Sequence, residues 1–268
     1  MLSIQQYIRA KSLEHAFQLL SEDEQNAILG GNLFLRLSNR RIKTAIDLTD
    51  LHLKYISEEA EYLEIGAMTT LRDIETSVLL RGFYSGVLPR VVTDIAGVQV
   101  RNQATVGGTV GGRYGFSDLL TVLMALDAKV ELYGKSVVPL ASYLANPSKL
   151  EIIEKLLIPK TKGRASFQSV RISSGDFALL NVAAVFVAPY WRISVGARPA
   201  AAKEATTAME FLNKLTSTGR QEIAEAAANV GVGMEFGDSM KTGAAYRRMI
   251  CPVLARRAME EIWNADNV

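Results

Sequence analysis

Apolar positions in the first third of the chain follow two different spacings. In SLEHAFQLL, apolar residues recur at helical spacing behind Ser12, whose hydroxyl can accept a hydrogen bond from the first turn, so an amphipathic helix is predicted. The short apolar run AILGGN follows and is typical of a strand that ends in a tight glycine turn. Two further strands, TAIDLTD and YLEIGAM, and a helix capped by its threonines, TTLRDIETS, complete this part.

The middle of the chain continues the mixed order of helices and strands. SDLLTVLMALDA has Ser117 as its N-cap and apolar residues on nearly every face, which predicts a helix buried on several sides. The strands AKVELYG and SVVPL follow it. The next stretch, from ASYLANPSKL to IPKTKGRAS, is richer in Pro, Ser, Gly and Lys, so we expect a domain boundary near Pro159.

The last third is more uniformly hydrophobic. FALLNVAAVFVAPYWRISVGA predicts two long strands joined by a turn near Pro189. Helices are predicted at AAAKEATTAMEFLN, QEIAEAAANV and AAYRRMICPVLARRAMEEIW. Pro252 is expected to kink or interrupt the last helix, because proline removes a backbone donor and crowds the preceding turn.

Composition narrows the class of protein. The 268 residues are 49% hydrophobic and 22% charged, with a formal charge of +2 spread among acids and bases, so neither nucleic acid nor anionic lipid is indicated as a partner. There is no signal-peptide run and no membrane-spanning apolar stretch, and Cys251 is the single cysteine. We therefore expect a soluble cytoplasmic protein with no intrachain disulfide and no iron-sulfur cluster of its own. His15 and His52 stand apart from other ligand residues, so no metal site is predicted.

The candidate chemistry lies in two glycine pairs, Gly30–Gly31 and Gly107–Gly108, each at the end of a β-like run. Glycine inside an element costs about 0.5 to 1 kcal/mol relative to alanine, so each pair needs a reason. Paired glycines leave backbone N–H groups uncovered and can form an anion-binding concavity, and two such turns would suit a ligand with two phosphates. Ordinary β-turns are the alternative.

Known nucleotide signatures do not account for these glycines. Neither cluster has the i, i+2, i+5 spacing of the dinucleotide fingerprint. Gly107 and Gly112 have the separation of a P-loop, but Arg113 and Tyr114 occupy the positions of its lysine and of its metal-binding hydroxyl residue. The missing metal ligand argues against phosphoryl transfer.

Several segments resemble one family along nearly the whole chain. AILGGN resembles its first flavin loop, IGAMTTLRDIE its Ile-Gly-Ala-Leu-Thr-Thr-Leu segment, and VQVRNQATVGGT its Gln-Ile-Arg-Asn stretch with the Thr-Ile-Gly-Gly turn. SDLLTVLMALDAKVEL continues in register, and LLIPK, GDFALLNVAAVF and AAYRRMICPVLARRAMEE match the C-terminal part. The family is the FAD-binding subunit or domain of the molybdenum hydroxylases, of xanthine dehydrogenase, carbon monoxide dehydrogenase and nicotinate dehydrogenase type.

The resemblance implies an α+β fold that binds FAD. Residues 1–159 would form an FAD-binding domain of the vanillyl-alcohol-oxidase (PCMH) type, with two α+β subdomains at approximately 1–52 and 53–159. Residues 160–268 would form a smaller C-terminal domain of antiparallel sheet and helices, like that of carbon monoxide dehydrogenase flavoproteins.

The resemblance also assigns cofactor-binding residues. Backbone amides of the first loop would meet the FAD diphosphate, the second turn would lie along the phosphate and ribityl portion, and an acid would accept hydrogen bonds from sugar hydroxyls. These residues are, in that order, Ile28, Leu29, Gly30, Gly31, Asn32 and Leu33; Thr105, Gly107, Gly108 and Thr109; and Asp118.

Four further positions follow from the register of the resemblance. Ile95 falls near the adenine end of FAD, and Ile153 and Gln168 fall near the isoalloxazine, although plain core packing is an equal alternative for the two isoleucines. Tyr114 lies in a loop that the family places beside the flavin ring. It would either cover the isoalloxazine face or support the loop as a half-buried tyrosine.

The function implied by the resemblance is electron transfer. FAD would receive electrons from iron-sulfur clusters and pass them to NAD or another acceptor, with no catalytic side chain in this subunit. A small [2Fe-2S] subunit and a large molybdopterin subunit are implied as partners, and the large subunit would determine the substrate. The alternative is a non-catalytic assembly or scaffold subunit that has lost flavin, because Leu33 and Phe34 replace the usual polar residues of the first loop.

Overall fold

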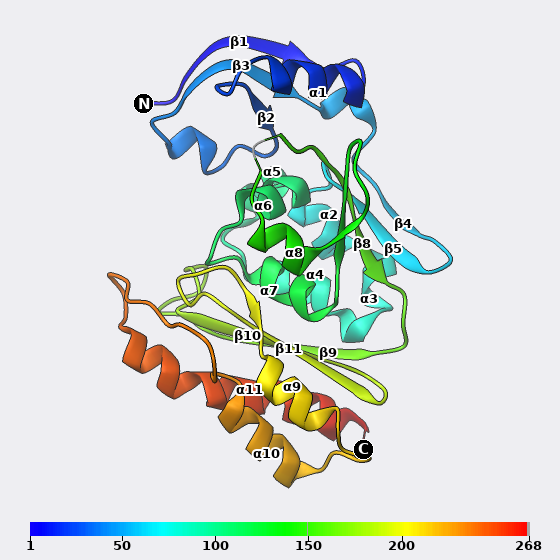
Figure 1. Ribbon diagram of the computed structural model, residues 1–268, viewed down its shortest axis with the longest axis vertical. Coiled ribbons are helices and arrows are strands. Elements are labelled where there is room, and N and C mark those ends of the chain that lie inside the picture. The colour runs from blue at the N-terminus through cyan, green and yellow to red at the C-terminus, as the bar shows by residue number, and fades with distance from the viewer. Residues whose placement is uncertain (149, 267–268) are drawn as a thin grey trace. The chain divides into compact units, whose positions relative to one another are not determined.

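The computed structural model describes residues 1–148 and 150–266 and has an α+β fold of helices and largely antiparallel sheets (Figure 1). The chain separates into two compact units. The first contains residues 1–74, 97–112 and 128–159, and the second contains residues 75–96, 113–127 and 160–268. Among the described residues, no helix is both long and apolar enough to cross a membrane.

A small parallel sheet begins the first unit. Its strands are β1 (Ser3–Arg9), β3 (Arg41–Asp47) and β2 (Ala27–Leu29), in the order β1-β3-β2. Helix α1 (Leu13–Glu22) buries its apolar side in a core with β3, and the Ser12 hydroxyl accepts a 3.0 Å hydrogen bond from the His15 amide. This confirms the predicted helix and cap, whereas β1 was not predicted. Apolar and polar residues are mixed along β1 and most of its residues are exposed, so its hydrophobic pattern is weak.

The rest of the first unit is built on a five-stranded sheet with the order β4-β5-β8-β6-β7, in which all neighbours are antiparallel. The predicted strands YLEIGAM and AKVELYG are confirmed as β5 and β6, and the short helices α5 and α6 lie within this unit. The elements are β4 (Ile56–Glu58), β5 (Tyr62–Gly66), α2 (Leu71–Thr76), α5 (Val98–Gln103), α6 (Val106–Gly112), β6 (Lys129–Leu132), β7 (Val138–Pro139), α8 (Leu140–Ala145) and β8 (Ile153–Pro159), with the 3-10 turns η1 (Leu35–Leu37) and η2 (Thr49–Leu51).

The second unit packs helices on a four-stranded antiparallel sheet with the order β12-β11-β10-β9. Alternate residues of β10 and β11, among them Val182, Trp191 and Ile193, form one core with the helices α9, α10 and α11. The elements are α3 (Val78–Arg81), η3 (Tyr84–Gly86), α4 (Val87–Thr93), α7 (Asp118–Ala125), β9 (Arg164–Val170), β10 (Leu180–Val187), β11 (Tyr190–Gly196), β12 (Lys203–Glu204), α9 (Thr206–Leu212), α10 (Arg220–Asn229) and α11 (Ala244–Asp266).

Helix α7 matches its prediction closely. The Ser117 hydroxyl accepts a hydrogen bond of 3.2 Å from the Leu120 amide, and all eight residues of the helix are buried. A helix that is apolar on every side can be stable only when it is surrounded.

Two predictions for the last third were wrong in part. The segment expected to be helical from Ala200 onward first forms β12, because Lys203 and Glu204 pair with β11, and the helix begins only at Thr206. Pro252 does not interrupt α11, which is assigned as one continuous helix of 23 residues. Its neighbours Cys251 and Leu254 are buried in the core, and this packing offsets the backbone hydrogen bond that proline cannot make.

The boundary expected near Pro159 lies where the compact units change, since the last segment of the first unit ends at Pro159. Residues 75–96 and 113–127, which precede that boundary in sequence, group with the C-terminal residues. The assignment of a cofactor domain and its two subdomains to particular ranges stays a proposal.

Candidate functional site

The first glycine segment leaves the carboxyl end of the parallel sheet. Leu29 pairs with Asp47 at the last register position of β2, and Gly30 follows directly. Asn32 has a left-handed φ of 59°, a conformation that asparagine tolerates better than most residues. Within residues 1–148 and 150–266, the amides of Gly30, Asn32 and Leu33 have no hydrogen-bond acceptor. The segment therefore offers backbone donors to an anion, as the glycine pattern predicted.

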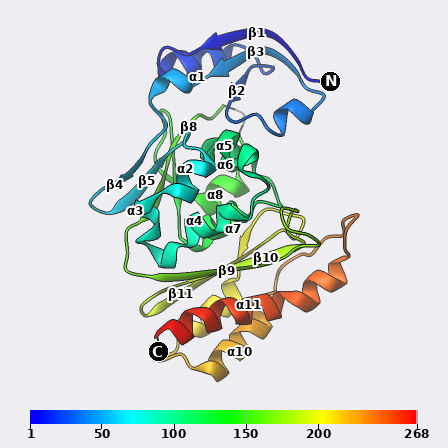
Figure 2. The same cartoon turned by 180° about the vertical axis from the view of Figure 1, so that it is seen from behind.

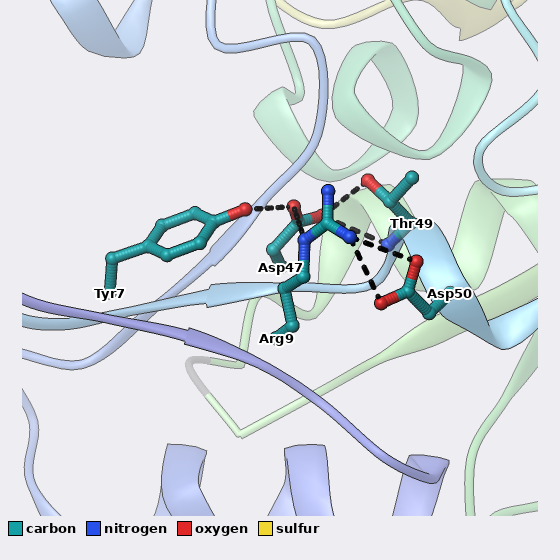
Figure 3. Close-up of polar contacts among 5 residues, drawn as sticks. All are labelled: Tyr7, Arg9, Asp47, Thr49 and Asp50. Carbon is teal, nitrogen blue, oxygen red and sulfur yellow. Dashed lines mark hydrogen bonds and ion pairs between the residues drawn. The ribbon is translucent and has the colours of Figure 1, made fainter.

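A polar cluster ties the neighbouring strand ends together (Figure 3). The Asp47 carboxylate accepts hydrogen bonds from the Tyr7 hydroxyl and from the amide and hydroxyl of Thr49, at 2.9 and 2.6 Å. Arg9 lies 4.0 Å from Asp47 and 3.3 Å from Asp50. Burial raises the pKa of Asp47, but the hydrogen bonds from Thr49 and Tyr7 outweigh it and hold the pKa below its ordinary value. An ionised Asp47 thus fixes the strand ends beside the first glycine segment.

The second glycine pair is not a turn after a strand, and this corrects the prediction. Gly107 and Gly108 lie in the first turn of α6. The Val106 amide donates to the Thr69 carbonyl at 2.9 Å, and the Gly107 amide donates to the Ala67 carbonyl at 2.7 Å. The Gly108 amide donates to the Thr105 hydroxyl oxygen at 3.1 Å. Since both glycine amides have acceptors, the expectation of uncovered amides was wrong at Gly107 and at Gly108.

One hydroxyl joins the two glycine segments. Thr105 Oγ1 accepts hydrogen bonds from the Gly31 amide at 3.2 Å and from the Gly108 amide at 3.1 Å. Thr105 is only 5% exposed, and in the described part of the chain its own hydroxyl proton has no acceptor. Because the two amides occupy the lone pairs of this oxygen, its proton remains available to an added acceptor.

The glycines themselves are required mainly by contact between chain segments. A Cβ on Gly31 would lie 2.0 Å from the Gln103 carbonyl oxygen, and one on Gly107 would lie 2.8 Å from that of Ala67. A Cβ on Gly30 would lie 2.8 Å from Thr105 Oγ1 and 3.2 Å from the Gly108 Cα. Side chains at Gly30 and Gly31 would push the first segment away from residues 103–108, and one at Gly107 would push α6 away from Ala67. The glycines of the first segment therefore bring the donors together rather than only exposing them.

Among the remaining predicted residues of the first unit, Thr109 continues α6 and donates its hydroxyl to the Thr105 carbonyl at 2.9 Å. Ile153 begins β8 and is buried, and its Cδ1 would lie 3.6 Å from a Cβ on Gly111. Ile28 and Leu29 belong to β2, where Leu29 is buried and Ile28 packs on the α1 core. The side chains of Ile28, Leu29 and Ile153 thus pack in the first unit, which was the alternative for Ile153, and contacts of these residues with FAD stay predictions.

In the second unit, Asp118 is the first residue of α7 and is buried. Its Oδ2 accepts from Arg171 Nη2 and its Oδ1 accepts from Asn181 Nδ2, each at 2.6 Å. Burial raises the pKa of Asp118, and the Arg171 guanidinium and the Asn181 amide act against this shift. Both carboxylate oxygens thus already have partners inside the unit, and the contact with sugar hydroxyls stays a prediction.

Tyr114 stacks on another ring of its own loop. Its ring lies 5.2 Å from that of Phe116 at an interplanar angle of 14°, and Phe116 lies 4.2 Å from Phe177. Stacking of this kind contributes about 0.5 to 1.5 kcal/mol beyond burial. These contacts fit the supporting role for Tyr114, and a contact with flavin stays a prediction.

The last two predicted residues occupy other parts of the second unit. The Gln168 amide on β9 donates to Glu261 of α11 at 2.8 Å. Ile95 follows α4, and its amide donates to the Val92 carbonyl at 3.0 Å. Neither contact involves the two glycine segments.

Sequence reasoning missed the residues that bind Asp118. Arg171 and Asn181 lie 53 and 63 positions further along the chain, and only their positions on either side of the β9–β10 connection bring them to α7. No local motif marks them. The bridging role of the Thr105 hydroxyl was likewise not visible, since its two donors come from segments that are distant in sequence.

Comparison with known sequences now adds to this geometry. A sequence model of the family described as the FAD binding domain in molybdopterin dehydrogenase matches residues 2–161, which is more than half of the chain. The chain belongs to this family. It is an FAD-binding oxidoreductase of the molybdenum hydroxylase family, and FAD is its cofactor.

Two relatives of this flavoprotein match over nearly their whole length. The nicotine 6-hydroxylase medium subunit of Paenarthrobacter nicotinovorans is 28% identical, with 95% of this chain and 96% of the relative aligned. The carbon monoxide dehydrogenase medium chain of Hydrogenophaga pseudoflava is 24% identical, with 96% of each chain aligned. A crystal structure of the carbon monoxide dehydrogenase from the same organism matches the fold with a TM-score of 0.90 at 22% identity, covering 98% of this chain and 99% of the other.

The residues of the first unit fit the diphosphate of FAD. A diphosphate needs hydrogen-bond donors and close backbone approach, and the segment after β2 supplies amides that have no acceptor among the described residues, next to the Gly31 amide that is bonded to Thr105. The aliphatic side chain of Leu33 does not change this supply, because the donors belong to the backbone.

Proposed function

We propose that this flavoprotein is the medium subunit of a multi-subunit molybdenum hydroxylase and carries electrons between redox centres of its complex. The proposed partners are a small [2Fe-2S] subunit and a large molybdopterin subunit, and the proposed acceptor is NAD or another carrier. Bound FAD supplies chemistry in one-electron and two-electron steps. Support comes from relatives named as medium subunits or chains that align end to end with this chain.

The observation that carries the proposal is the double hydrogen bond to Thr105. This residue holds the Gly31 and Gly108 amides on one oxygen, and the neighbouring amides of Gly30, Asn32 and Leu33 have no acceptor in the part of the chain that the structure describes. We assign the diphosphate of FAD to these donors. Because the Thr105 hydroxyl bonds both segments, they are fixed to each other and little ordering energy is lost when the cofactor binds.

The assigned residues of the second unit would act on the rest of the cofactor. Asp118 is held rigidly by Arg171 and Asn181, so any oxygen lone pair that it offers to a sugar hydroxyl has a fixed direction. Tyr114 would present an aromatic edge or face next to the flavin ring, and Ile95 and Gln168 are assigned to the adenine and isoalloxazine ends. We assign the protein to the cytoplasm because its sequence has a single cysteine, as is usual in a reducing compartment where disulfides do not form.

The experiment is to purify the chain and record its visible absorption spectrum, followed by acid precipitation. We expect a yellow protein that releases all of its flavin into the supernatant, because neither His15, His52 nor Cys251 lies in the segments assigned to FAD. Flavin retained in the pellet would contradict noncovalent binding. A colourless protein that stays colourless after incubation with FAD would support the alternative, an assembly subunit that has lost flavin.

The acceptor is tested separately by running the transfer in reverse. NADH is added to the flavin-loaded chain without oxygen, and the flavin absorption is followed. Bleaching by NADH would support NAD as acceptor. Bleaching by dithionite alone would exclude NAD and leave another carrier as the acceptor.

A further inference from the structure

A buried ion pair lies at the start of α7, inside the second unit. Arg171 Nη2 donates to Asp118 Oδ2 at 2.6 Å, and the two side chains are only 11% and 5% exposed. Removing two charges from water costs about as much free energy as their attraction returns, so a buried pair adds little net stability to a fold. This pair therefore needs another reason.

The guanidinium of Arg171 is fixed from two sides. Its Nη1 donates to the Asp176 carbonyl at 2.7 Å, which closes the connection between β9 and β10. The Asp176 carboxylate is itself paired with Lys241 at 2.8 Å. Because a planar guanidinium that is bonded at both terminal nitrogens cannot turn freely, Arg171 presents Nη2 to Asp118 in one direction.

The other oxygen of Asp118 has a neutral donor. Asn181 Nδ2 donates to Asp118 Oδ1 at 2.6 Å, and Asn181 Oδ1 accepts from the Thr121 hydroxyl at 2.8 Å. Helix α7 packs on β10 and β11 (Figure 2), so closely that a Cβ on Gly196 would lie 2.0 Å from Thr121 Oγ1. An ionised carboxylate only accepts, so the amide nitrogen of Asn181 must face it. Arg171 is then the partner that supplies charge.

Asp118 keeps acceptor capacity beyond these two bonds. A carboxylate has about four lone-pair sites, and Arg171 and Asn181 occupy one on each oxygen. Sugar hydroxyls are donors, so the remaining sites suit the FAD contact proposed for this residue. The contact requires an ionised Asp118, because a protonated carboxyl would turn one of its acceptor oxygens into a donor.

The surroundings of Asp118 act on its charge in opposite directions. Burial raises the pKa of Asp118, and repulsion from Asp94, directly after α4, raises it further. The Arg171 guanidinium and the Asn181 amide lower this pKa. Arg171 is the cation among these groups, so its removal would leave burial and Asp94 opposed only by a neutral amide.

The connection that carries Arg171 also supports Tyr114, another residue assigned to FAD. The ring of Phe177, in this connection, lies 4.2 Å from that of Phe116, and Phe116 stacks on Tyr114 at 5.2 Å. One connection between β9 and β10 thus holds two assigned residues, the first through an ion pair and the second through stacked rings.

We propose that Arg171 is a positioning residue for FAD, whose charge keeps Asp118 an ionised and directed acceptor for the sugar hydroxyls of the cofactor. The effect of Arg171 on FAD passes through Asp118. This inference rests on the proposed function, and it adds a residue and a dependence on pH to the same site.

The test is a titration of flavin-free protein with FAD from about pH 6 to about pH 9, followed by flavin fluorescence. Arg171→Met removes the charge and keeps an unbranched side chain. We expect its Kd at about pH 6 to be at least about tenfold above that of wild type, and the deficit to shrink as the pH rises and Asp118 ionises again. His15 and His52 are present in both proteins, so the comparison cancels their titration.

Two further variants serve as controls. Arg192→Met is matched, because Arg192 bonds Asp127, just after α7, at 2.9 Å and has no assigned role toward FAD. Its Kd should follow wild type at each pH. Arg171→Lys keeps the charge, so it should follow the wild-type pH profile with a Kd about three- to tenfold higher. Thermal unfolding of each flavin-free variant reports whether it is folded.

The outcomes separate this inference from the proposed function. Wild-type affinity in Arg171→Met, or a loss of affinity that is the same at every pH, would overturn the role of Arg171 and leave the proposed function intact. Should Arg171→Met not fold, Arg171→Lys is compared in wild type and in Asp118→Asn, where it should have no effect. Equal effects in the two backgrounds would overturn the inference. A wild-type chain that binds no FAD would overturn the proposed function as well.

Discussion

Replacing Thr105 by valine tests the central contact of the cofactor site. Valine has nearly the same shape as threonine, but it cannot accept the hydrogen bonds that the hydroxyl receives from the Gly31 and Gly108 amides at 3.2 and 3.1 Å. The variant also loses the hydroxyl proton assigned to the FAD diphosphate. Shape is kept, so the change isolates hydrogen bonding.

The magnitude follows from the bonds that are lost. Each internal hydrogen bond contributes about 0.5 to 1.5 kcal/mol net, so two of them amount to about 1 to 3 kcal/mol. In wild type this energy maintains the arrangement of the two glycine segments that binds FAD. Its loss in Thr105→Val should therefore raise the Kd for FAD about five- to 150-fold. Gly108 is exposed and its amide can be solvated, which favours the lower half of that range.

The assay is titration of flavin-free protein with FAD, followed by flavin fluorescence, with thermal unfolding measured in parallel. Thr105→Ser keeps the hydroxyl and should bind FAD within about threefold of wild type. Thr93→Val removes a hydroxyl that bonds the Pro89 carbonyl at 3.0 Å in α4 and serves as a control for threonine loss elsewhere. Wild-type affinity in Thr105→Val, at a temperature where the protein is folded, would refute the role assigned to this hydroxyl.

Three further predictions follow from the contacts of single residues. Gly31→Ala should abolish flavin binding, because its Cβ would lie 2.0 Å from the Gln103 carbonyl oxygen. Gly111→Ala should bind flavin normally, because its Cβ would lie 3.6 Å from the nearest atom, Ile153 Cδ1. Equal flavin content in the two purified variants would contradict this prediction. Tyr7→Phe should lower the free energy of unfolding by about 0.5 to 1 kcal/mol at pH 7. Because the folded-state pKa of Asp47 is lowered, its contribution to stability is present above the unfolded pKa and is lost as the pH falls. Denaturant titrations should therefore show the difference in free energy of unfolding between wild type and Tyr7→Phe narrowing below about pH 4. A difference that stays constant with pH would count against the hydrogen bond between Tyr7 and Asp47. Burial raises the pKa of the Cys251 thiol to about 12, so the protonated thiol's contribution to the free energy of unfolding is lost only as the pH rises above about 9. At neutral pH, a thiol reagent should label Cys251 no faster than the chain unfolds.

Local patterns in the sequence specified those elements whose signals need no distant partner. The serine caps of α1 and α7 and the all-round burial of α7 were readable because capping and helical periodicity act within a few residues. The glycine pairs marked the two segments of the candidate site, and the family resemblance that they carried predicted FAD, which the family comparison confirmed.

The same patterns misled where tertiary pairing overrides local preference. Lys203 and Glu204 lie in a run of good helix formers, yet β11 offers them backbone partners and they form β12. The weak pattern of β1 gave no prediction, although β3 fixes that strand through parallel pairing. Pro252 was expected to disturb a helix that core packing maintains.

Only the tertiary structure decided how the glycines are used. The sequence indicated exposed amides at both pairs, but the Gly107 amide donates to the Ala67 carbonyl and the Gly108 amide to the Thr105 hydroxyl oxygen. Among the described residues, amides without an acceptor are found in the segment after β2. The Thr105 hydroxyl joins residues 31 and 108, and Arg171 reaches Asp118 across 53 positions of the chain. A sequence encodes such contacts through the packing of whole elements, because the direction and distance of a hydrogen bond between distant segments are set only when both segments are held in place.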